Sequence, residues 1–274
     1  MNKRIIILGN GNLGKYLERY LSKLYSVTVY DRRHFNAMFF SDSEFFKRNI
    51  KSGDVVINSV GLLKPNIKSQ EAAWEVNAVF PQIMQSICED NNANFIHICS
   101  DCVFKGDKGK YLEIDEPDCN EAYGISKSQV TEGTIIRTSF IGKYGGLLKW
   151  VLDSYELGAE EITGYDNCIW NGVTALELCK YIALIIDADD FWDGVRHFHT
   201  PGAISKYDLC RLISNIYSLN ITINQVKATD ISGTRVGVDN KLDRTLASTQ
   251  RLPYVPTFEQ QLKELKLYDS KQSQ

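Results

Sequence analysis

The feature that most constrains the fold is a glycine-rich turn near the start of the chain. The apolar run Arg4–Leu8 is typical of a β-strand, a G-x-G-x-x-G turn follows it at once, and Leu13, Leu17 and Leu21 then repeat at helical spacing. In such a turn the first glycine makes the bend, the second lets the backbone approach a pyrophosphate, and the third lets the helix pack closely on the strand. The motif predicts a dinucleotide-binding domain, with these residues at the cofactor: Gly9, Asn10, Gly11, Asn12, Leu13 and Gly14.

A second strand, Val27–Tyr30, ends in an acid about twenty residues beyond the glycines. Asp31 at that place can hold a ribose hydroxyl and favours NAD, whereas Arg32 or Arg33 could pair with the 2′-phosphate of NADP. The expected cofactor is therefore NADPH or NADH. A third strand, Asp54–Asn58, leads into a segment expected along the cofactor: Ser59, Val60 and Gly61.

The stretch from Phe95 to Glu132 carries the candidate chemistry. A buried-looking strand leads into Ser100, and Tyr123 and Lys127 follow at a spacing that places both on one face of a helix. An ammonium beside a phenol favours the phenolate, so we expect Lys127 to lower the pKa of Tyr123. The Ser100 hydroxyl could hydrogen-bond an oxygen on which charge develops during reduction of a carbonyl.

Strands and helices alternate up to about residue 140, which predicts an α/β fold with a doubly wound parallel Rossmann sheet. Ligands of such sheets bind beyond the carboxyl ends of the strands, where Gly9, Asp31, Ser59 and Ser100 all fall. We therefore expect an NAD(P)-binding core with the catalytic residues over 1–140. Residues 141–274 are expected to complete the sheet and form a small substrate-binding cap, with some segments interleaved. The later pattern predicts helices over 147–157, 172–187, 206–217 and 257–267 and strands over 160–163, 195–199 and 221–226.

Composition excludes several function classes. The net charge of −3 provides no basic field for nucleic acid or an anionic membrane, and no apolar run approaches the ~18 residues of a membrane helix. Seven scattered cysteines are an odd number and favour a reducing, cytoplasmic location over a disulfide framework. Cys99 and Cys102 form a C-x-x-C, but a second ligand pair is not visible, so we expect no metal. His97 is expected to be a packed or hydrogen-bonded ring.

These motifs resemble the extended short-chain dehydrogenase/reductase superfamily, and within it the dTDP-4-dehydrorhamnose reductases. The family pattern S-T-D-Y-V-F-x-G corresponds to Cys99–Gly106, Y-x-E-x-D-x-P to Tyr111–Pro117, and Y-G-x-x-K to Tyr123–Lys127. Further matches are Val76-Asn77 with Pro81, Arg137-Thr-Ser139, the turn Pro201–Ser205 and Leu242-Asp243. The family's catalytic Thr is Ser100 here, and the aromatic after Asp101 is Cys102.

The resemblance implies an NAD(P)H-dependent reductase of a nucleotide-linked 4-keto-6-deoxy sugar, as in dTDP-rhamnose biosynthesis. Ser100 would orient the carbonyl, Tyr123 would give the proton, Lys127 would tune Tyr123 and hold the nicotinamide ribose, and Asn77 would stand in a proton relay. The partner is then a small-molecule nucleotide sugar, and a homodimer is one expected assembly, although the catalytic helix is short. The expected substrate-contacting residues are Asp101, Cys102, Val103, Phe104 and Trp170.

Two alternatives remain open. In GDP-fucose synthase-like enzymes a Cys two residues after the catalytic Ser is an epimerising acid/base, and Cys102 has that spacing from Ser100, with Lys149 as a candidate second acid. The chain could instead be a non-catalytic NAD(P)-binding regulatory subunit, although a binding module has no need of Ser100, Tyr123 and Lys127 together.

Overall fold

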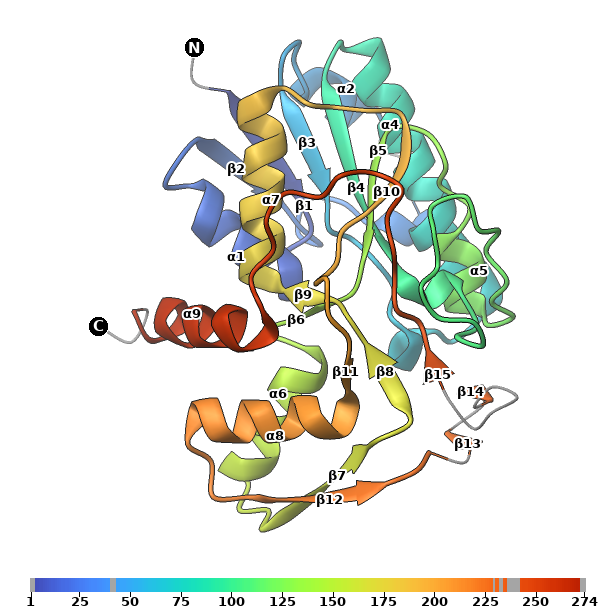
Figure 1. Ribbon diagram of the computed structural model, residues 1–274. Coiled ribbons are helices and arrows are strands. Elements are labelled where there is room, and N and C mark those ends of the chain that lie inside the picture. The colour runs from blue at the N-terminus through green and yellow to red at the C-terminus, as the bar shows by residue number, and fades with distance from the viewer. Residues whose placement is uncertain (1–2, 40–42, 229, 232–233, 236–241, 272–274) are drawn as a thin grey trace. The chain divides into compact units, whose positions relative to one another are not determined.

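The structure is a computed structural model, which describes residues 3–39, 43–228, 230–231, 234–235 and 242–271. Its helices are α1 Asn12–Leu21, α2 Ser43–Asn49, α3 Gln70–Trp74, α4 Phe80–Asp90, α5 Ala122–Lys127, α6 Gly146–Glu156, α7 Ala175–Ala188, α8 Lys206–Tyr217 and α9 Phe258–Ser270. The strands of the main sheet are β1 Arg4–Leu8, β2 Ser26–Tyr30, β3 Val55–Asn58, β4 Asn94–Ser100, β5 Thr134–Thr138 and β10 Gly194–His197. The remaining strands are β6 Phe140–Ile141, β7 Glu161–Tyr165, β8 Cys168–Trp170, β9 Val173–Thr174, β11 Ile204–Ser205, β12 Thr222–Val226, β13 Asp230–Ile231, β14 Thr234–Arg235 and β15 Leu242–Asp243 (Figure 1).

The chain divides into two compact units, each assembled from separate segments. The first unit comprises Met1–Val103, Glu116–Arg137 and Cys179–Arg196, and the second comprises Phe104–Asp115, Thr138–Leu178 and His197–Gln274. Segment 104–115 precedes the boundary expected near residue 140 but belongs to the second unit, and segment 179–196 follows that boundary but belongs to the first unit.

The main sheet confirms the predicted Rossmann-type α/β fold. Its strand order is β10-β5-β4-β3-β1-β2, and β1 pairs in parallel with both β2 and β3. From β1 the chain crosses to β2 on one side, whereas from β3 it crosses to β4 on the other, so the order reverses between β1 and β3. Ligands of open α/β sheets bind at such a switch point. The glycine turn after β1 and the segment after β3 therefore flank the expected cofactor position.

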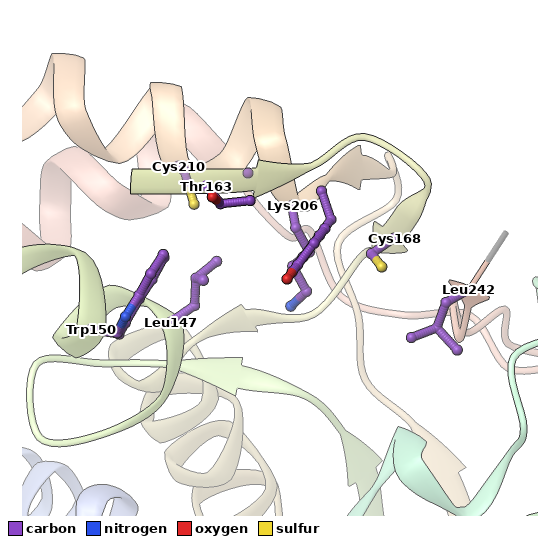
Figure 2. Close-up of a pocket in the computed structure, with 9 residues that line it drawn as sticks. Leu147, Trp150, Thr163, Cys168, Lys206, Cys210 and Leu242 are labelled. Atoms are coloured by element: carbon purple, nitrogen blue, oxygen red, sulfur yellow. The ribbon is translucent and has the colours of Figure 1, made fainter. Parts of the chain in front are cut away.

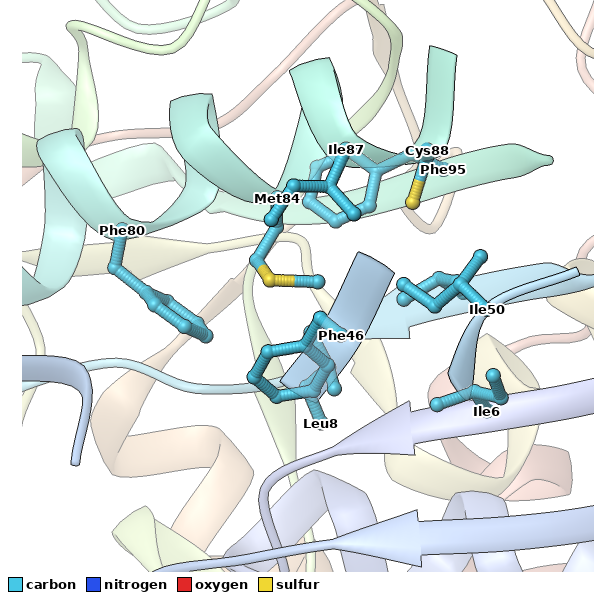
Figure 3. Close-up of a cluster of buried hydrophobic side chains, with 10 residues drawn as sticks. Ile6, Leu8, Phe46, Ile50, Phe80, Met84, Ile87, Cys88 and Phe95 are labelled. Atoms are coloured by element: carbon cyan, nitrogen blue, oxygen red, sulfur yellow. The ribbon is translucent and has the colours of Figure 1, made fainter. Parts of the chain in front are cut away.

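One hydrophobic core of the first unit lies between the sheet and the helices α2 and α4 (Figure 3). Strand side chains alternate between faces, so Ile6 and Leu8 point to this core while Ile5 and Ile7 are buried on the other side. The cluster consists of Ile6, Leu8, Phe46, Ile50, Val56, Phe80, Met84, Ile87, Cys88 and Phe95. Burial on both faces explains why these parallel strands have nearly continuous apolar sequences.

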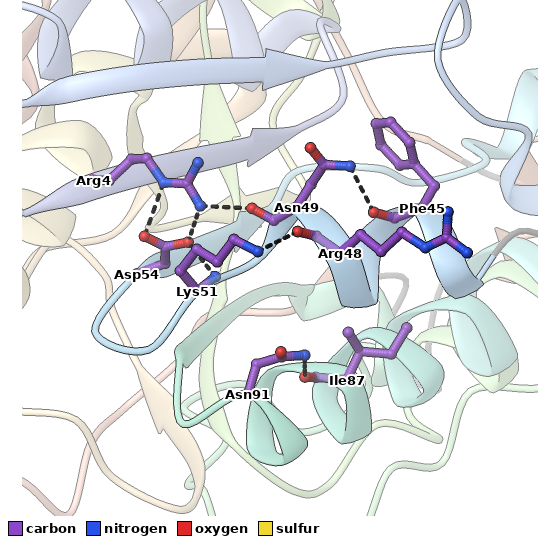
Figure 4. A network of polar contacts seen from close by, with 8 residues as sticks. All are labelled: Arg4, Phe45, Arg48, Asn49, Lys51, Asp54, Ile87 and Asn91. Atoms are coloured by element: carbon purple, nitrogen blue, oxygen red, sulfur yellow. Dashed lines mark hydrogen bonds and ion pairs between the residues drawn. The ribbon is translucent and has the colours of Figure 1, made fainter.

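A polar network connects the amino ends of strands β1 and β3 (Figure 4). The Arg4 guanidinium forms an ion pair with the buried Asp54 carboxylate, and it also donates to the Asn49 carbonyl at 2.6 Å. The Lys51 backbone N–H donates to the same carboxylate at 2.7 Å. The network ties the start of β1 to the start of β3, at the edge of the sheet opposite to the glycine turn.

The helical stretch that begins after Ser69 is interrupted before it reaches α4. Ser69 caps α3 by accepting a hydrogen bond from the Ala72 N–H, but residues Glu75–Val79 form a π-helical turn before α4 begins. Asn77 lies inside this turn and is completely buried. A π-turn inside a helix frequently marks a functional position.

In the second unit the helices match the sequence pattern more closely than the strands do. Helix α8 spans the predicted range with Ser205 as its N-cap, and α9 begins with a capping box formed by Thr257 and Gln260. The strands predicted over 160–163 and 221–226 correspond to β7 and β12, and these two strands pair in parallel. The three-stranded sheet β11-β8-β15 was not predicted, because its strands have only two or three residues and come from distant parts of the chain.

Candidate active site

The glycine turn has the geometry that a bound pyrophosphate requires. Gly9 has φ +93°, a conformation that side chains disfavour, and a Cβ on Gly14 would lie 2.2 Å from the Gly9 carbonyl oxygen. A Cβ on Gly11 would meet no atom within 4 Å. Gly9 and Gly14 are therefore needed for the turn itself, while Gly11 borders open space at the start of α1. These residues fit a dinucleotide held at the helix N-terminus.

The segment after β3 packs against this turn. The Ser59 hydroxyl donates to the Leu8 carbonyl at 2.8 Å, and the Val60 side chain lies 3.1 Å from the ideal Cβ position of Gly9. Ser59 thus supports the glycine turn through the Leu8 carbonyl, and Gly61 lies next to Lys127 of α5. A Cβ on Gly61 would lie 3.5 Å from Nζ of Lys127.

The first unit brings together Ser100, Tyr123 and Lys127. Ser100 ends β4, and its hydroxyl lies close enough to the Tyr123 phenol on α5 to lower the pKa of that phenol. The same Ser100 oxygen accepts the Cys102 N–H at 3.1 Å and lies 3.2 Å from a carboxylate oxygen of the buried Asp101. The hydroxyl therefore has a fixed position between the end of β4 and helix α5.

The expectation that Lys127 lowers the pKa of Tyr123 is wrong for the protein alone. Burial raises the pKa of Tyr123 well above its usual value, the Cys102 thiol adds to the rise, and the nearby Ser100 hydroxyl only partly opposes it. The Lys127 amine donates to the Ile98 carbonyl at 3.0 Å, and burial lowers its pKa to about 8. Desolvation has the largest effect on the pKa of each group, because it disfavours the phenolate of Tyr123 and the ammonium of Lys127.

Asn77 lies beside these residues, but its amide group holds backbone and helix together. Its Oδ1 accepts the Leu62 N–H at 2.8 Å, and its Nδ2 donates to the Leu62 carbonyl at 3.1 Å and to the Ser126 hydroxyl at 3.2 Å. Ser126 in turn donates to the Tyr123 carbonyl at 3.1 Å. Sequence reasoning missed Ser126, whose only signal was its place one residue before Lys127 on the same short helix.

Gly124 explains how α5 approaches the end of β4. A Cβ there would lie 2.3 Å from the Cys102 carbonyl oxygen and 2.4 Å from the Cys119 sulfur. Only a glycine permits this contact, so the glycine of the Y-G-x-x-K pattern has a packing role that sequence reasoning did not assign. Cys102 and Cys119 are both half-buried thiols around it.

His97 is the packed ring that the sequence predicted. It is completely buried, its Nδ1 lies 3.1 Å from the Asn58 amide, and it stacks on Phe95. Burial, with a further contribution from the Lys127 charge, holds its pKa well below the usual value. The ring is therefore neutral at physiological pH.

The remaining expected substrate residues are more buried than a contact surface would be. Val103 is buried, and Phe104, also fully buried, stacks on Tyr111 with ring centroids 4.1 Å apart. Trp170 is 4 % exposed, donates its indole N–H to the Ser139 hydroxyl at 2.9 Å and packs against Phe258. Substrate contacts by these residues stay predictions.

The second unit contains a pocket of about 340 Å³, which is within the size range of small-molecule sites (Figure 2). Trp150 from α6, Thr163 from β7, and Lys206 and Cys210 from α8 point into it. The full lining is Leu147, Trp150, Thr163, Gly164, Tyr165, Cys168, Lys206, Cys210 and Leu242. The walls are apolar apart from a single ammonium group and a few polar atoms.

Metal and membrane features can be stated for the part of the chain that the structure describes. All seven cysteines lie in the described ranges, and none of them forms a disulfide. Within those ranges no cluster of three or more His, Cys, Asp or Glu side chains is arranged to hold a metal ion. Among the described helices, none combines the length and the apolar character needed to cross a membrane.

Comparison with known proteins identifies similar sequences over nearly the whole chain. Residues 3–264 match the sequence profile of the family described as RmlD substrate binding domain. A dTDP-4-dehydrorhamnose reductase of Mycobacterium tuberculosis is 27 % identical over 194 residues, which cover 63 % of this chain and 62 % of that protein. The chain thus spans less than two thirds of the length of this curated relative.

Solved structures share the fold at lower sequence identity. The dTDP-4-dehydrorhamnose reductase of Bacillus anthracis in complex with NADP superposes with a TM-score of 0.82 at 21 % identity, over 97 % of this chain and 99 % of that one. The UDP-glucose 4-epimerase of Thermotoga maritima with UDP-glucose gives a TM-score of 0.74 at 15 % identity, over 99 % and 100 % of the two chains. Proteins with different reactions thus share this architecture, and the fold alone does not choose among them.

Proposed function

The chain belongs to the RmlD substrate binding domain family, and from this premise we propose that it is an NAD(P)H-dependent reductase of a nucleotide-linked 4-keto-6-deoxy sugar. The observation that carries the proposal is the proximity of the Ser100 hydroxyl to the Tyr123 phenol, with the Lys127 amine on the same short helix as the phenol. A proton donor, a carbonyl-orienting hydroxyl and a cation next to the cofactor segment are the groups that carbonyl reduction needs.

Each side chain has a definite task in this reaction. NADPH or NADH, when bound at the glycine turn, supplies the hydride. Tyr123 is protonated at neutral pH because its pKa is raised, so its phenol has a proton to give to the carbonyl oxygen. Ser100 donates to that oxygen and thereby stabilises its developing charge. Lys127, largely an ammonium below its pKa of about 8 and close to Gly61 of the cofactor segment, holds the nicotinamide ribose.

The pocket of the second unit supports a nucleotide-linked substrate. A nucleobase binds through stacking and apolar contact, which the half-exposed Trp150 ring offers, and a diphosphate needs a cation, which Lys206 offers. The proposal therefore assigns carbonyl chemistry to the first unit and nucleotide recognition to the second.

The test measures oxidation of NADPH and NADH at 340 nm with enzymatically generated dTDP-4-keto-6-deoxy sugars, with and without a separate 3,5-epimerase. We expect turnover with the epimerised sugar. In Tyr123→Phe the rate should fall by about 10³-fold, in the range typical of a lost general acid, while binding of the cofactor stays within about twofold. Unchanged turnover in Tyr123→Phe would contradict the role of the phenol.

A second candidate, an epimerase/reductase, draws on one observation. The Cys102 thiol lies close enough to Tyr123 to raise the pKa of the phenol, so a potential acid/base stands beside the reduction site. Its suggested partner Lys149 forms an ion pair with Asp153 one turn further along α6. Turnover without the separate epimerase, with solvent deuterium at C3 or C5 that is lost in Cys102→Ser, would favour this function.

Tight cofactor binding without turnover of any nucleotide sugar would instead favour the regulatory subunit.

A further inference from the structure

We propose that Arg33 decides the cofactor preference of this protein: it masks the Asp31 carboxylate, so that the site accepts the 2′-phosphate of NADP(H) as well as the 2′-hydroxyl of NAD(H). The inference deepens the proposed function and rests on its cofactor site. By sequence alone the acid at the end of β2 favours NAD and the two arginines favour NADP. In the structure the Asp31 carboxylate already forms an ion pair with Arg33.

Both oxygens of the Asp31 carboxylate are occupied by neighbours in the same turn. Nε of Arg33 lies 3.1 Å from each oxygen, and a terminal Arg33 nitrogen lies 2.8 Å from Oδ2. The Arg33 backbone N–H donates to Oδ1 at 3.0 Å, and the His34 ring lies 3.1 Å from the same oxygen. An acid bound in this way presents little uncompensated negative charge to an incoming phosphate.

The position of this pair in the fold places it at the ribose rather than elsewhere on the cofactor. Asp31 directly follows β2, which pairs with β1, and the Gly9 N–H donates to the Tyr30 carbonyl at 2.8 Å. The carboxylate therefore lies beside the glycine turn, where the adenosine ribose of a dinucleotide is held.

Arg33 can bind a phosphate without releasing Asp31. A guanidinium has five N–H donors, and the contacts with Asp31 use Nε and one terminal nitrogen, which leaves the other terminal nitrogen for a second anion. The Arg33 side chain is 80 % exposed whereas that of Asp31 is 15 % exposed, so the cation has solvent on its outer side. Arg32 is exposed next to it and adds a second positive charge. A planar guanidinium matches phosphate geometry better than an ammonium does.

The test is a set of binding measurements by isothermal titration calorimetry, with NADP⁺, NAD⁺, 2′,5′-ADP and 5′-AMP as probes. The natural protein should bind NADP⁺ at least as tightly as NAD⁺. In Arg33→Ala the affinity for NADP⁺ should fall by about tenfold or more, because a cation is lost and an anion is exposed, while that for NAD⁺ changes by less than about threefold. Arg32→Ala, which leaves Asp31 masked, should have the smaller effect.

A double variant separates masking from simple loss of charge. If Arg33 acts by masking, Asp31→Asn in the Arg33→Ala background restores most of the lost NADP⁺ affinity. The affinity for 2′,5′-ADP should fall in Arg33→Ala and recover in the double variant in the same way. Arg48→Ala is the charge-matched control, since α2 ends at the opposite edge of the sheet near Lys51, and it should change neither affinity. Retained 5′-AMP binding shows that each variant is folded at the site.

Two results would overturn the inference: NAD⁺ binding that is a hundredfold tighter than NADP⁺ binding in the natural protein, or an unchanged ratio of the two affinities in Arg33→Ala. These measurements contain no sugar. If selectivity depends on Arg33 but no sugar is reduced, the proposed function fails and this inference stands.

Discussion

The two candidate sites of this chain are built in different ways. In the first unit the site consists of backbone turns and a closed set of hydrogen bonds: Gly9 and Gly14 shape one turn, and Asn77 joins Leu62 to Ser126. In the second unit the pocket consists of side chains, chiefly apolar, that project from separate elements such as α6 and α8. A backbone site can fail by losing its shape, whereas a side-chain pocket can change its contacts and keep its fold.

The largest contrast should come from two glycines in the same turn. In Gly14→Ala the new Cβ would lie 2.2 Å from the Gly9 carbonyl oxygen, so the backbone must move, and we expect a loss of about 4 kcal/mol or more in the free energy of unfolding. In Gly11→Ala the methyl group enters open space, so the loss should stay near 1 kcal/mol while NAD(P)⁺ binding weakens. Urea unfolding and calorimetry measure both quantities.

Equal destabilisation by these two variants would break the comparison, because Gly11 would then also be needed for the shape of the turn. Weakened cofactor binding by Gly14→Ala alone would mean that Gly11 does not border the pyrophosphate.

Asn77 should come next in size. Asn77→Ala leaves the Leu62 N–H and carbonyl and the Ser126 hydroxyl without their partner, and the amide is completely buried. We expect a loss of about 3 kcal/mol in unfolding free energy, measured by urea titration. Asn77→Asp keeps an acceptor for the Leu62 N–H but has no donor, so it should destabilise as well.

A proton relay through Asn77 would give a different result. Its removal would then lower kcat and alter the pH profile while leaving stability within about 1 kcal/mol.

The difference between the units also marks the limit of prediction from sequence. Local signals were reliable: the glycine turn, the helix over 206–217 and the short helix with Tyr123 and Lys127 were all predicted, because each depends on neighbours in the chain. The strand Cys168–Trp170 was not found, since it gains its definition from Ile204–Ser205 and Leu242–Asp243, far away in sequence.

The same limit applies within the candidate active site. The residues Ser100, Tyr123 and Lys127 could be named from spacing, but the direction of the Tyr123 pKa could not. Spacing reports which charges are near, whereas burial depends on the whole fold. The π-turn around Asn77 was not predicted for a related reason: the Asn77 side chain makes its hydrogen bonds to residues outside the helix.

The buried Lys127 amine should lower the free energy of unfolding of the protein at neutral pH. Burial lowers the amine pKa from its usual 10.5 to about 8, so between these values the unfolded chain holds a proton that the folded chain has lost. Stability therefore rises with pH across that window, and below pH 8 the buried ammonium costs about 3 kcal/mol. Lys127→Met should gain about 2 kcal/mol at pH 7, less than the full cost because the Ile98 carbonyl loses its donor, and should abolish turnover.

Urea unfolding of Lys127→Met at pH 7 and pH 10.5 gives the check, since the gain should shrink at the higher pH. Lys68→Met, which removes an exposed lysine, is the control and should stay within about 0.5 kcal/mol at both values. A variant less stable than the natural protein at pH 7 would show that the ammonium is stabilised rather than strained by its surroundings.

The smallest effect should come from the pocket of the second unit. Trp150 is 43 % exposed and lines the pocket, so Trp150→Ala removes stacking area without opening a cavity in the core. We expect KM for the nucleotide sugar to rise about tenfold, kcat to stay within about twofold, and the free energy of unfolding to change by less than about 1 kcal/mol. Tyr155→Ala on the same helix, 39 % exposed and outside the pocket lining, should leave KM unchanged. If Trp150→Ala instead lowered kcat with KM unchanged, the pocket would act on the reacting group itself, and the separation between a backbone-built reaction site and a side-chain-built recognition site would not hold.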